Sequence, residues 1–414
     1  MKHKSLMFAL LSAGRLLVCC LAATTGLSVG AAGQAPPSKA PTRVAFERAV
    51  LNAANDVFSK ADLAGAPESI ELAIDPLIDS DTGAQSNATR MEARLIADLV
   101  RRRYQRFALV PFNTAAVSKS PYVLIGTLTH LNNAGIPGGP RDAYRVWLTL
   151  MDLKSNRIVA KSQARALPTG VDPVPTTFFA ESPIFAKDPA TEAYIEACHH
   201  TKVGDPIPQA YAQRVLVAAQ TSDATEAYNA RRYQAALDLY EAGRQMPGGE
   251  QLRILNGIYL ANLRLNRPEA AAAAFGEVID FGLQRNRLAV KFLFRPGSTQ
   301  FVSDQRVSGP YSMWLGQIAR HVAKKRQCLD VVGHTSPTGP VSLNDELSRL
   351  RAEQIRGRLQ GEASELNERL TARGVGSREN IVGTGRDDAS DALDRRVEFT
   401  VVSCSSLPPR PKGT

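Results

Sequence analysis

Arg351 is the side chain whose setting in the sequence most directly predicts chemistry. It lies in a stretch with helical periodicity, and Leu347 and Ile355 stand four residues before and after it. Residues at that spacing share one face of a helix, so Arg351 lies along the apolar stripe. A guanidinium on the buried side of a helix needs an anionic partner. That partner is either a ligand carrying a carboxylate or, inside the protein, Asp330 or Asp394.

Three ordered motifs surround this arginine. Residues 333–339 read Gly-His-Thr-Ser-Pro-Thr-Gly, and residues 394–399 read Asp-Arg-Arg-Val-Glu-Phe. Between them, Asn344 precedes Leu347-Ser348 and Arg351-Ala352. Over residues 288–404 this set resembles the peptidoglycan-binding OmpA-like domain, whose pattern is G-H-T-D-x-x-G, then N-x-x-L-S-x-x-R-A, then D-R-R-V-E.

The resemblance implies a ligand and a site. In the family, the arginine corresponding to Arg351 holds the carboxylate of diaminopimelate in the peptidoglycan stem peptide, because a planar fork binds two oxygens at once. The implied peptidoglycan-binding residues are Thr335, Ser336, Gly339, Asn344, Leu347 and Arg351.

Ser336 departs from the family pattern. The family has a carboxylate there, which takes the ammonium of the same diaminopimelate centre, whereas a serine hydroxyl accepts a hydrogen bond without neutralising the charge. The departure predicts weaker binding, an altered ligand or a substitute carboxylate. The candidate substitutes, which as turn or helix-cap residues have an ordinary structural explanation, are Asp345, Asp387, Asp388 and Asp391.

Two other clusters of reactive residue types predict less. His334 has no nucleophile or orienting carboxylate near it in sequence, and its family counterpart is structural, so we expect no catalysis. Cys198, His199 and His200 are adjacent, and three adjacent side chains cannot all reach one ion. We therefore expect a solvated loop there, no metal, no cofactor and no enzymatic activity.

The elements that must hold the site alternate between strands and helices. We expect strands over residues 290–294, 328–332, 381–383 and 394–404, a helix opening at Pro310 and another over about 343–359. This order predicts a two-layer α/β sandwich. If the strands at 328–332 and 394–404 are antiparallel neighbours, Cys328 and Cys404 meet at one edge and form a disulfide, leaving Cys198 as a free thiol.

Residues 42–200 predict a small α/β accessory domain. Helical spacing covers 45–61 and 88–104, and strand patterns cover 70–75, 107–110, 122–126, 144–150 and 158–160, the last two joined by a hairpin turn at 155–156. The pattern is similar to that of α/β domains in curli-secretion lipoproteins and in activators of cell-wall synthases. This likeness assigns no residue a role.

Residues 208–283 lack strand patterns and contain a repeat. Ala236 and Tyr240 recur as Ala271 and Phe275, in each case 35 residues later. This resembles tetratricopeptide repeats, in which a small residue lets two helices approach and an aromatic residue fills the groove. Two repeats predict either a groove that binds a partner or a helical spacer between domains.

The N-terminus and the charge predict a location. Lys2, Lys4 and Arg15 precede an uncharged run that ends in small residues, so residues 1–35 are expected to be a secretory signal peptide. The formal charge of +10 then falls by about three in the mature protein. A mildly basic chain suits an anionic polymer or membrane surface, and no dense basic run with aromatic residues indicates nucleic acid.

The sequence thus predicts a multidomain α/β protein of the periplasm, associated with the cell wall or outer membrane. Its C-terminal domain would bind peptidoglycan, and a protein partner would bind the helical repeats or the N-terminal domain. The alternative is an adaptor of a secretion or cell-wall synthase complex whose OmpA-like domain no longer binds peptidoglycan.

Overall fold

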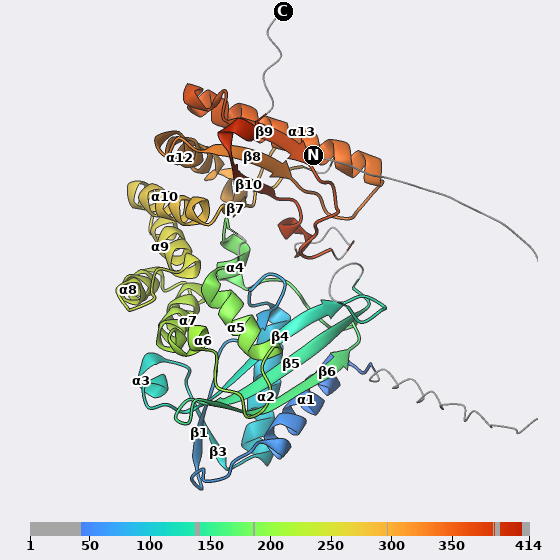
Figure 1. The fold of residues 1–414 in the computed structure, drawn as a ribbon, viewed down its shortest axis with the longest axis vertical. Helices are drawn as coiled ribbons and strands as arrows, with labels where there is room; N and C mark the ends of the chain where they lie inside the picture. The colour runs from blue at the N-terminus through green and yellow to red at the C-terminus, as the bar shows by residue number, and fades with distance from the viewer. Residues whose placement is uncertain are drawn as a thin grey trace, which may run out of the picture. The chain divides into compact units, whose positions relative to one another are not determined.

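Two mixed β-sheets organise the chain, and a group of helices connects them (Figure 1). The computed structural model describes residues 43–136, 141–184, 187–295, 297–383, 385 and 390–407. The expected signal peptide and two candidate carboxylates, Asp387 and Asp388, lie outside these residues. The described residues belong to one compact unit.

The first sheet is built from the N-terminal part. Its strands are β1 (Ile70–Ile74), β2 (Ile78–Asp79), β3 (Phe107–Val110), β4 (Tyr122–Leu131), β5 (Ala143–Asp152) and β6 (Arg157–Ala166). They follow the order β3-β1-β4-β5-β6, with β2 paired to β4. β1 is parallel to β3 and β4, and β4, β5 and β6 are antiparallel neighbours. The expected hairpin is confirmed, with Asn156 at a φ of 55° in its turn.

Helices cover both faces of this sheet. α1 (Phe46–Lys60) and α2 (Asn87–Arg103) pack on the face of Leu124 and Leu148. α5 (Pro189–His199) packs on the other face, with Ile125 and Met151. α2 begins where Ser86 and Thr89 form a reciprocal capping box. No sequence pattern predicted α3 (Thr114–Val117), α4 (Thr177–Glu181) or α5, whereas α6 (Gln209–Ala212) falls at the start of the predicted helical region.

Four consecutive helices follow, as the repeat predicted. They are α7 (Val215–Asn229), α8 (Tyr233–Arg244), α9 (Leu252–Arg264) and α10 (Pro268–Gln284). Ala236 and Ala271 are both buried, in agreement with their predicted place at helix contacts. The ring of Tyr240 lies where a Cβ at Gly257 would be, so glycine is required for α8 and α9 to pack. The tetratricopeptide assignment itself remains a prediction.

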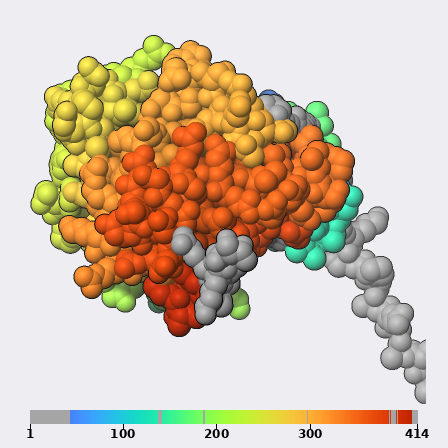
Figure 2. Space-filling model, turned by 90° about the horizontal axis from the view of Figure 1, so that it is seen from above, coloured from blue at the N-terminus to red at the C-terminus, as the bar shows by residue number. Residues whose placement is uncertain are grey.

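The second sheet carries the motifs of the C-terminal part. Its strands are β7 (Arg287–Val290), β8 (Cys328–Gly333), β9 (Leu370–Gly374) and β10 (Val397–Val402), in the order β7-β10-β8-β9. β10 is antiparallel to β7 and β8, whereas β9 is parallel to β8. Two long helices, α12 (Tyr311–Lys324) and α13 (Val341–Glu362), share a core with it, and the short α11 (Gln305–Ser308) precedes them. This C-terminal part, orange to red, fills most of the face shown in Figure 2.

Two predicted strands of this part were misplaced. The strand expected at 381–383 is wrong: these residues form a loop, and the strand that pairs with β8 is β9. The reason is that the Asp394 carboxylate accepts hydrogen bonds from the N–H groups of Ile381, Val382 and Gly383, which would otherwise pair in a sheet. The strand expected at 290–294 ends at Val290 as β7, and beyond it only an isolated bridge joins Phe294 to Phe301.

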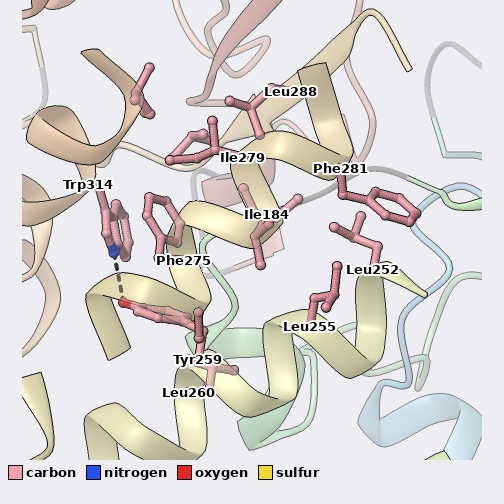
Figure 3. Packing of buried hydrophobic residues seen from close by; sticks show 14 of the residues in the cluster. Ile184, Leu252, Leu255, Tyr259, Leu260, Phe275, Ile279, Phe281, Leu288 and Trp314 are labelled. Carbon is pink, nitrogen blue, oxygen red and sulfur yellow. Dashed lines mark hydrogen bonds between the residues drawn. The ribbon is translucent and has the colours of Figure 1, made fainter. Parts of the chain in front are cut away.

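The helices and the second sheet share one hydrophobic core (Figure 3). The Trp314 indole on α12 donates a hydrogen bond of 2.7 Å to the Tyr259 hydroxyl on α9 and stacks on Phe275 of α10 at 5.6 Å. His321 of α12 also lies 2.9 Å from the carboxylate of Asp280. The repeat helices are therefore packed onto the C-terminal part through a shared core.

The predicted disulfide is confirmed. Cys328 and Cys404 are bonded, with their Cα atoms 5.2 Å apart, and β8 and β10 are the antiparallel neighbours that this pairing required. Cys198 is a free, buried thiol, also as predicted. Its burial raises the pKa to about 11, so the thiol stays protonated and unreactive near neutral pH.

Candidate functional site

The loop that follows β8 is held from both sides by the backbone. The N–H of His334 donates to the Arg396 carbonyl at 3.0 Å, and the N–H of Thr335 donates to the Gly376 carbonyl at 2.9 Å. The loop thus starts between the segment that leads into β10 and the segment that leaves β9. This fixes the side chains of the first motif at one end of the sheet.

Glycines bring α13 against that end of the sheet. A Cβ on Gly333 would collide with the backbone carbonyl of Ser348, and one on Gly374 would collide with the Ser348 hydroxyl and the backbone of Arg349. The glycines that end β8 and β9 are therefore required for the close approach of the helix. Because α13 lies this close, its second and third turns stand beside the loop.

Polar contacts close the loop onto α13. The Asn344 amide donates to the Thr338 carbonyl at 3.1 Å, and Gly339 has a φ of +92°, which favours glycine. The Ser348 hydroxyl donates to the Asp345 carbonyl at 2.8 Å and accepts from the N–H of Gly376 at 2.9 Å. The structure therefore links the first two motifs through direct contacts, whereas the role expected for Asn344 came only from the resemblance to the OmpA-like pattern.

Arg351 is buried on α13, as its spacing predicted, with 3% of its surface exposed. Its Nε donates to the Ser298 carbonyl at 3.1 Å and its Nη2 to the Arg295 carbonyl at 3.3 Å. The guanidinium also stacks 4.8 Å from the centre of the Phe294 ring. The segment after β7 therefore fixes the plane of the guanidinium, a role that no sequence motif indicated.

The two carboxylates proposed as internal partners of Arg351 are engaged elsewhere. Asp330 accepts hydrogen bonds from the Thr371 hydroxyl at 2.9 Å and from Nε of Arg373 at 2.6 Å. Asp394 accepts the three backbone N–H groups of residues 381–383 at 2.6 to 2.9 Å. Burial raises the pKa of Asp394, and those N–H groups act against that rise. These contacts give the third motif a structural role in holding the loop before β10.

The hydroxyls of the loop differ in their surroundings. Thr335 is 2% exposed, and its Oγ1 has no hydrogen-bond partner among the residues that the structure describes. Such a buried hydroxyl costs roughly 1 to 3 kcal/mol of free energy unless something satisfies it. Ser336 is also buried, Leu347 is half-buried, and Gly339 is exposed. His334 is buried, with its Nδ1 3.9 Å from Glu379.

Two of the four candidate substitutes for the missing family carboxylate can be placed. Asp345 pairs with Arg378 at 2.6 Å, so its charge is already balanced at the surface. Asp391 is fully buried. Asp387 and Asp388 lie outside the described residues.

The expectation of a solvated loop at residues 198–200 is wrong. Cys198 and His199 form the end of α5, and His200 is its C-cap. The His199 ring lies 2.7 Å from the Thr127 hydroxyl and 5.0 Å from the Trp147 ring, and its partial burial lowers its pKa to about 4. Among the described residues, no group of three or more His, Cys, Asp or Glu side chains is arranged to hold a metal ion.

Comparison with known proteins identifies partial structural likenesses. No family model matches the chain. No curated protein matches it either. Among solved structures, it is similar to the peptidoglycan-associated lipoprotein of Burkholderia pseudomallei, at 26% identity and a TM-score of 0.23, over 28% of this chain and 89% of that one. It is likewise similar to the periplasmic domain of MotB from Helicobacter pylori, at 21% identity and a TM-score of 0.23, over 28% of this chain and 74% of that one.

A third similar structure is the OmpA-like domain of FopA1 from Francisella tularensis, at 15% identity and a TM-score of 0.22, over 28% of this chain and 75% of that one. These structures are described as peptidoglycan-associated, periplasmic or OmpA-like. What the C-terminal part can bind depends on the residues of the loop and of α13.

Proposed function

We propose that this chain is a non-catalytic periplasmic protein that binds peptidoglycan through residues 288–404 and thereby anchors or scaffolds an assembly of the cell envelope. The observation that carries the proposal is the buried Thr335 hydroxyl without a hydrogen-bond partner among the described residues, on the loop that Asn344 closes against α13. A buried polar atom of this kind calls for a partner, which an ordered water or a ligand can supply, and in this proposal the ligand supplies it.

In this proposal the ligand is the diaminopimelate of the stem peptide. Arg351 supplies the fork for its carboxylate, and the contacts to the Arg295 and Ser298 carbonyls hold that fork in one plane. Thr335 and Asn344 supply polar contacts, Gly339 lets the ligand approach the backbone, and Leu347 supplies apolar contact. Ser336 accepts a hydrogen bond from the ammonium.

The division into parts supports a scaffold. We propose a signal peptide over 1–35, an α/β accessory domain over 42–200, tetratricopeptide-like repeats over 208–283 and an OmpA-like domain over 288–404, with a protein partner on the repeats or the accessory domain. In the part of the chain that the structure describes, no helix is long and apolar enough to cross a membrane.

The second candidate is an adaptor of a secretion or synthase complex that does not bind the wall. Ser336 favours it, because a neutral hydroxyl replaces the carboxylate that would complete a clamp for a zwitterion. The two candidates differ in whether the mature protein binds isolated cell wall.

Co-sedimentation of mature protein with purified sacculi tests the proposal. The wild type should sediment with sacculi, and Arg351→Ala should abolish this because the ligand carboxylate loses its fork. Arg358→Ala is the matched control: Arg358 is exposed on the same helix and stacks on Phe301 at 4.8 Å, the distance that Arg351 has from Phe294. Equal sedimentation of all three proteins, with unchanged circular dichroism, would reject wall binding through this site and favour the adaptor.

A further inference from the structure

The first sheet contains a break beside its central parallel strand. β1 and β2 both pair in parallel with β4, Ile74 with Leu124 and Ile78 with Thr127. Three residues, 75–77, therefore stand opposite the two residues of β4 that lie between these pairs, so the chain bulges between β1 and β2. A bulge of this kind redirects a side chain and is frequent beside functional sites.

Tyrosine hydroxyls and a buried carboxylate occupy this break. The Tyr194 hydroxyl, on α5, accepts from the N–H of Gly126 at 3.0 Å and donates to the carbonyl of the same glycine at 3.1 Å. Asp75 opens the bulge and is 5% exposed, and its Oδ2 accepts from the Tyr211 hydroxyl, on α6, at 2.7 Å. No described residue bonds its Oδ1. Burial raises the pKa of Asp75 to about 7, while Tyr211 and Arg253 act in the opposite direction.

A pocket of about 50 Å³ lies beside this carboxylate. Its walls come from the segment after β1 and from α5, α6, α7 and the start of α9. The pocket is therefore at the carboxyl end of a strand that lies between two parallel neighbours, where ligands of α/β sheets commonly bind. Its charged lining residues are Asp75, Asp188, Arg214 and Arg253. Asp188 already accepts N–H groups in the first turns of α5 and α9.

Neither guanidinium of the pocket has a carboxylate partner among the residues that the structure describes. Nη2 of Arg253 donates to the Gly83 carbonyl at 3.1 Å, and the same side chain stacks 5.3 Å from the centre of the Phe179 ring. Nη1 of Arg214 donates to the Ala210 carbonyl at 2.8 Å. Each of these hydrogen bonds uses one of several N–H donors, and a neutral carbonyl leaves the charge of the guanidinium uncompensated.

A carboxylate and two guanidiniums thus line one pocket without pairing with one another. A molecule complementary to both kinds of charge must carry a cation and an anion itself. A pocket of this volume holds about four water-sized groups, so the molecule must be among the smallest of that kind.

We propose that this pocket binds a small free amino acid, glycine or alanine, with its ammonium against Asp75 and its carboxylate against Arg253 and Arg214. The site lies outside residues 288–404, so it gives the chain a ligand in addition to the proposed one in the cell wall. A polar pocket filled by water alone is the alternative that the experiment must separate.

Isothermal titration calorimetry of the full mature protein with glycine, L-alanine and D-alanine tests the proposal. At least one of them should bind saturably. Acetate and ethylamine carry one charge each and should bind at least about tenfold more weakly. Asp75→Asn and Arg253→Gln should each weaken amino-acid binding by about tenfold or more, because each removes one of the complementary charges.

Two matched controls and a blocking variant accompany these changes. Arg285→Gln removes an arginine that also stacks on a phenylalanine ring and donates to a backbone carbonyl, but lies away from the pocket. Asp223→Asn removes a half-buried carboxylate of α7 that does not line it. Both should leave the affinity unchanged. Ser222→Leu should fill the pocket from its half-buried position on α7 and abolish binding, even if Asp75→Asn does not fold.

Four outcomes would overturn the proposal. Acetate that binds as tightly as the amino acids would mean an anion site, and ethylamine that does so would mean a cation site. Absence of saturable binding by every compound would mean a pocket that holds only water. Normal binding of amino acids by Arg253→Gln and Ser222→Leu proteins with unchanged circular dichroism would mean a site elsewhere. Sedimentation with sacculi should be the same for all these variants, so failure of this inference is distinguishable from failure of wall binding.

Discussion

The loop after β8 and the groove beside α4 are two concave regions built on different principles. The loop is fixed by backbone hydrogen bonds among three short motifs, and its glycines allow α13 to approach. The groove is formed by side chains from helices α9, α10 and α12, together with Lys291 and the end of α4, and no motif marks it. The loop resembles a known motif except at Ser336, whereas no sequence motif marks the groove, which lies at the end of α4.

The difference between the loop and the groove shows that a sequence motif reflects the backbone path of a loop. Gly333, Gly339 and Asn344 set the backbone path of the loop through a close approach of α13, a positive φ and a hydrogen bond to Thr338. Ser336 is the position at which the loop departs from the pattern that it resembles. The groove, by contrast, is shaped by side chains that come from three separate helices.

Removal of the disulfide should have the largest effect and should separate stability from ligand binding. Changing Cys328 and Cys404 together to serine frees a loop of 76 residues and should lower the free energy of unfolding by about 4 kcal/mol in the chain-entropy model. Urea denaturation measures the loss, and dithiothreitol should have the same effect on the wild type. The bond lies at the opposite end of β8 from Thr335, so sedimentation with sacculi should persist below the transition.

Phe178→Ala tests whether α4 is firmly packed against the helices α7 and α8. Truncation of a fully buried aromatic side chain should cost about 3 kcal/mol of unfolding free energy, also measured in urea. Phe179→Ala, at the half-buried neighbouring position, should cost less. A loss below about 1 kcal/mol for Phe178→Ala would show that α4 is only loosely held by the helices. The surroundings of α4 would then be less firmly packed than its contacts indicate.

Ser336→Asp should sharpen the contrast by giving the loop the carboxylate of the pattern that it resembles, if the proposed wall binding holds. A charged hydrogen bond to the ligand ammonium should replace a neutral one and tighten binding to sacculi by about 1 to 2 kcal/mol. Ser336→Asn provides the control, because asparagine has nearly the same shape as aspartate and carries no charge. If Ser336→Asp changes nothing while loss of Asp387 or Asp388 prevents sedimentation, a carboxylate in the loop before β10 has taken over this role.

Lys291, which lines the groove, should change its protonation at mildly alkaline pH. Burial lowers its pKa to about 8, with Glu181 acting in the opposite direction. Lys291 therefore loses its proton as pH rises through about 8.

The same shift affects stability in a defined direction. The folded-state pKa of Lys291 lies below its unfolded value, so the unfolded chain binds more protons between about pH 8 and pH 10.5. The contribution of this residue to stability should therefore increase as pH rises through that interval. A contribution that decreases there would mean that Lys291 is charged and well compensated in the folded protein.

The sequence predicted the C-terminal part in most of its elements because its signals are local. Pro310 precedes α12, the spacing around Arg351 predicted its burial, and the cysteines at the strand ends predicted their bond. β9 was missed because Thr371, Ala372 and Arg373 give no clear alternation, whereas residues 381–383 look like a strand until the Asp394 carboxylate takes their N–H groups.

Tertiary contacts account for the rest of what the sequence did not show. The Ser298 and Arg295 carbonyls that orient Arg351 belong to a loop more than 50 residues away, and backbone acceptors leave no trace in side-chain patterns. The insertion of Phe178 between Tyr228 and Tyr240 joins segments that the sequence assigned to different domains. No periodicity predicts such a contact.

The hydrogen bond between Trp314 and Tyr259 has an optical consequence. The chain contains two tryptophans, and the other, Trp147, lies on β5 in the first sheet beside Arg145 and His199. The two tryptophans therefore lie in different parts of the fold, Trp314 on α12 at the junction with the repeat helices and Trp147 on the first sheet. In Trp147→Phe protein, the emission of Trp314 alone would report when α9, α10 and α12 separate, without any added label.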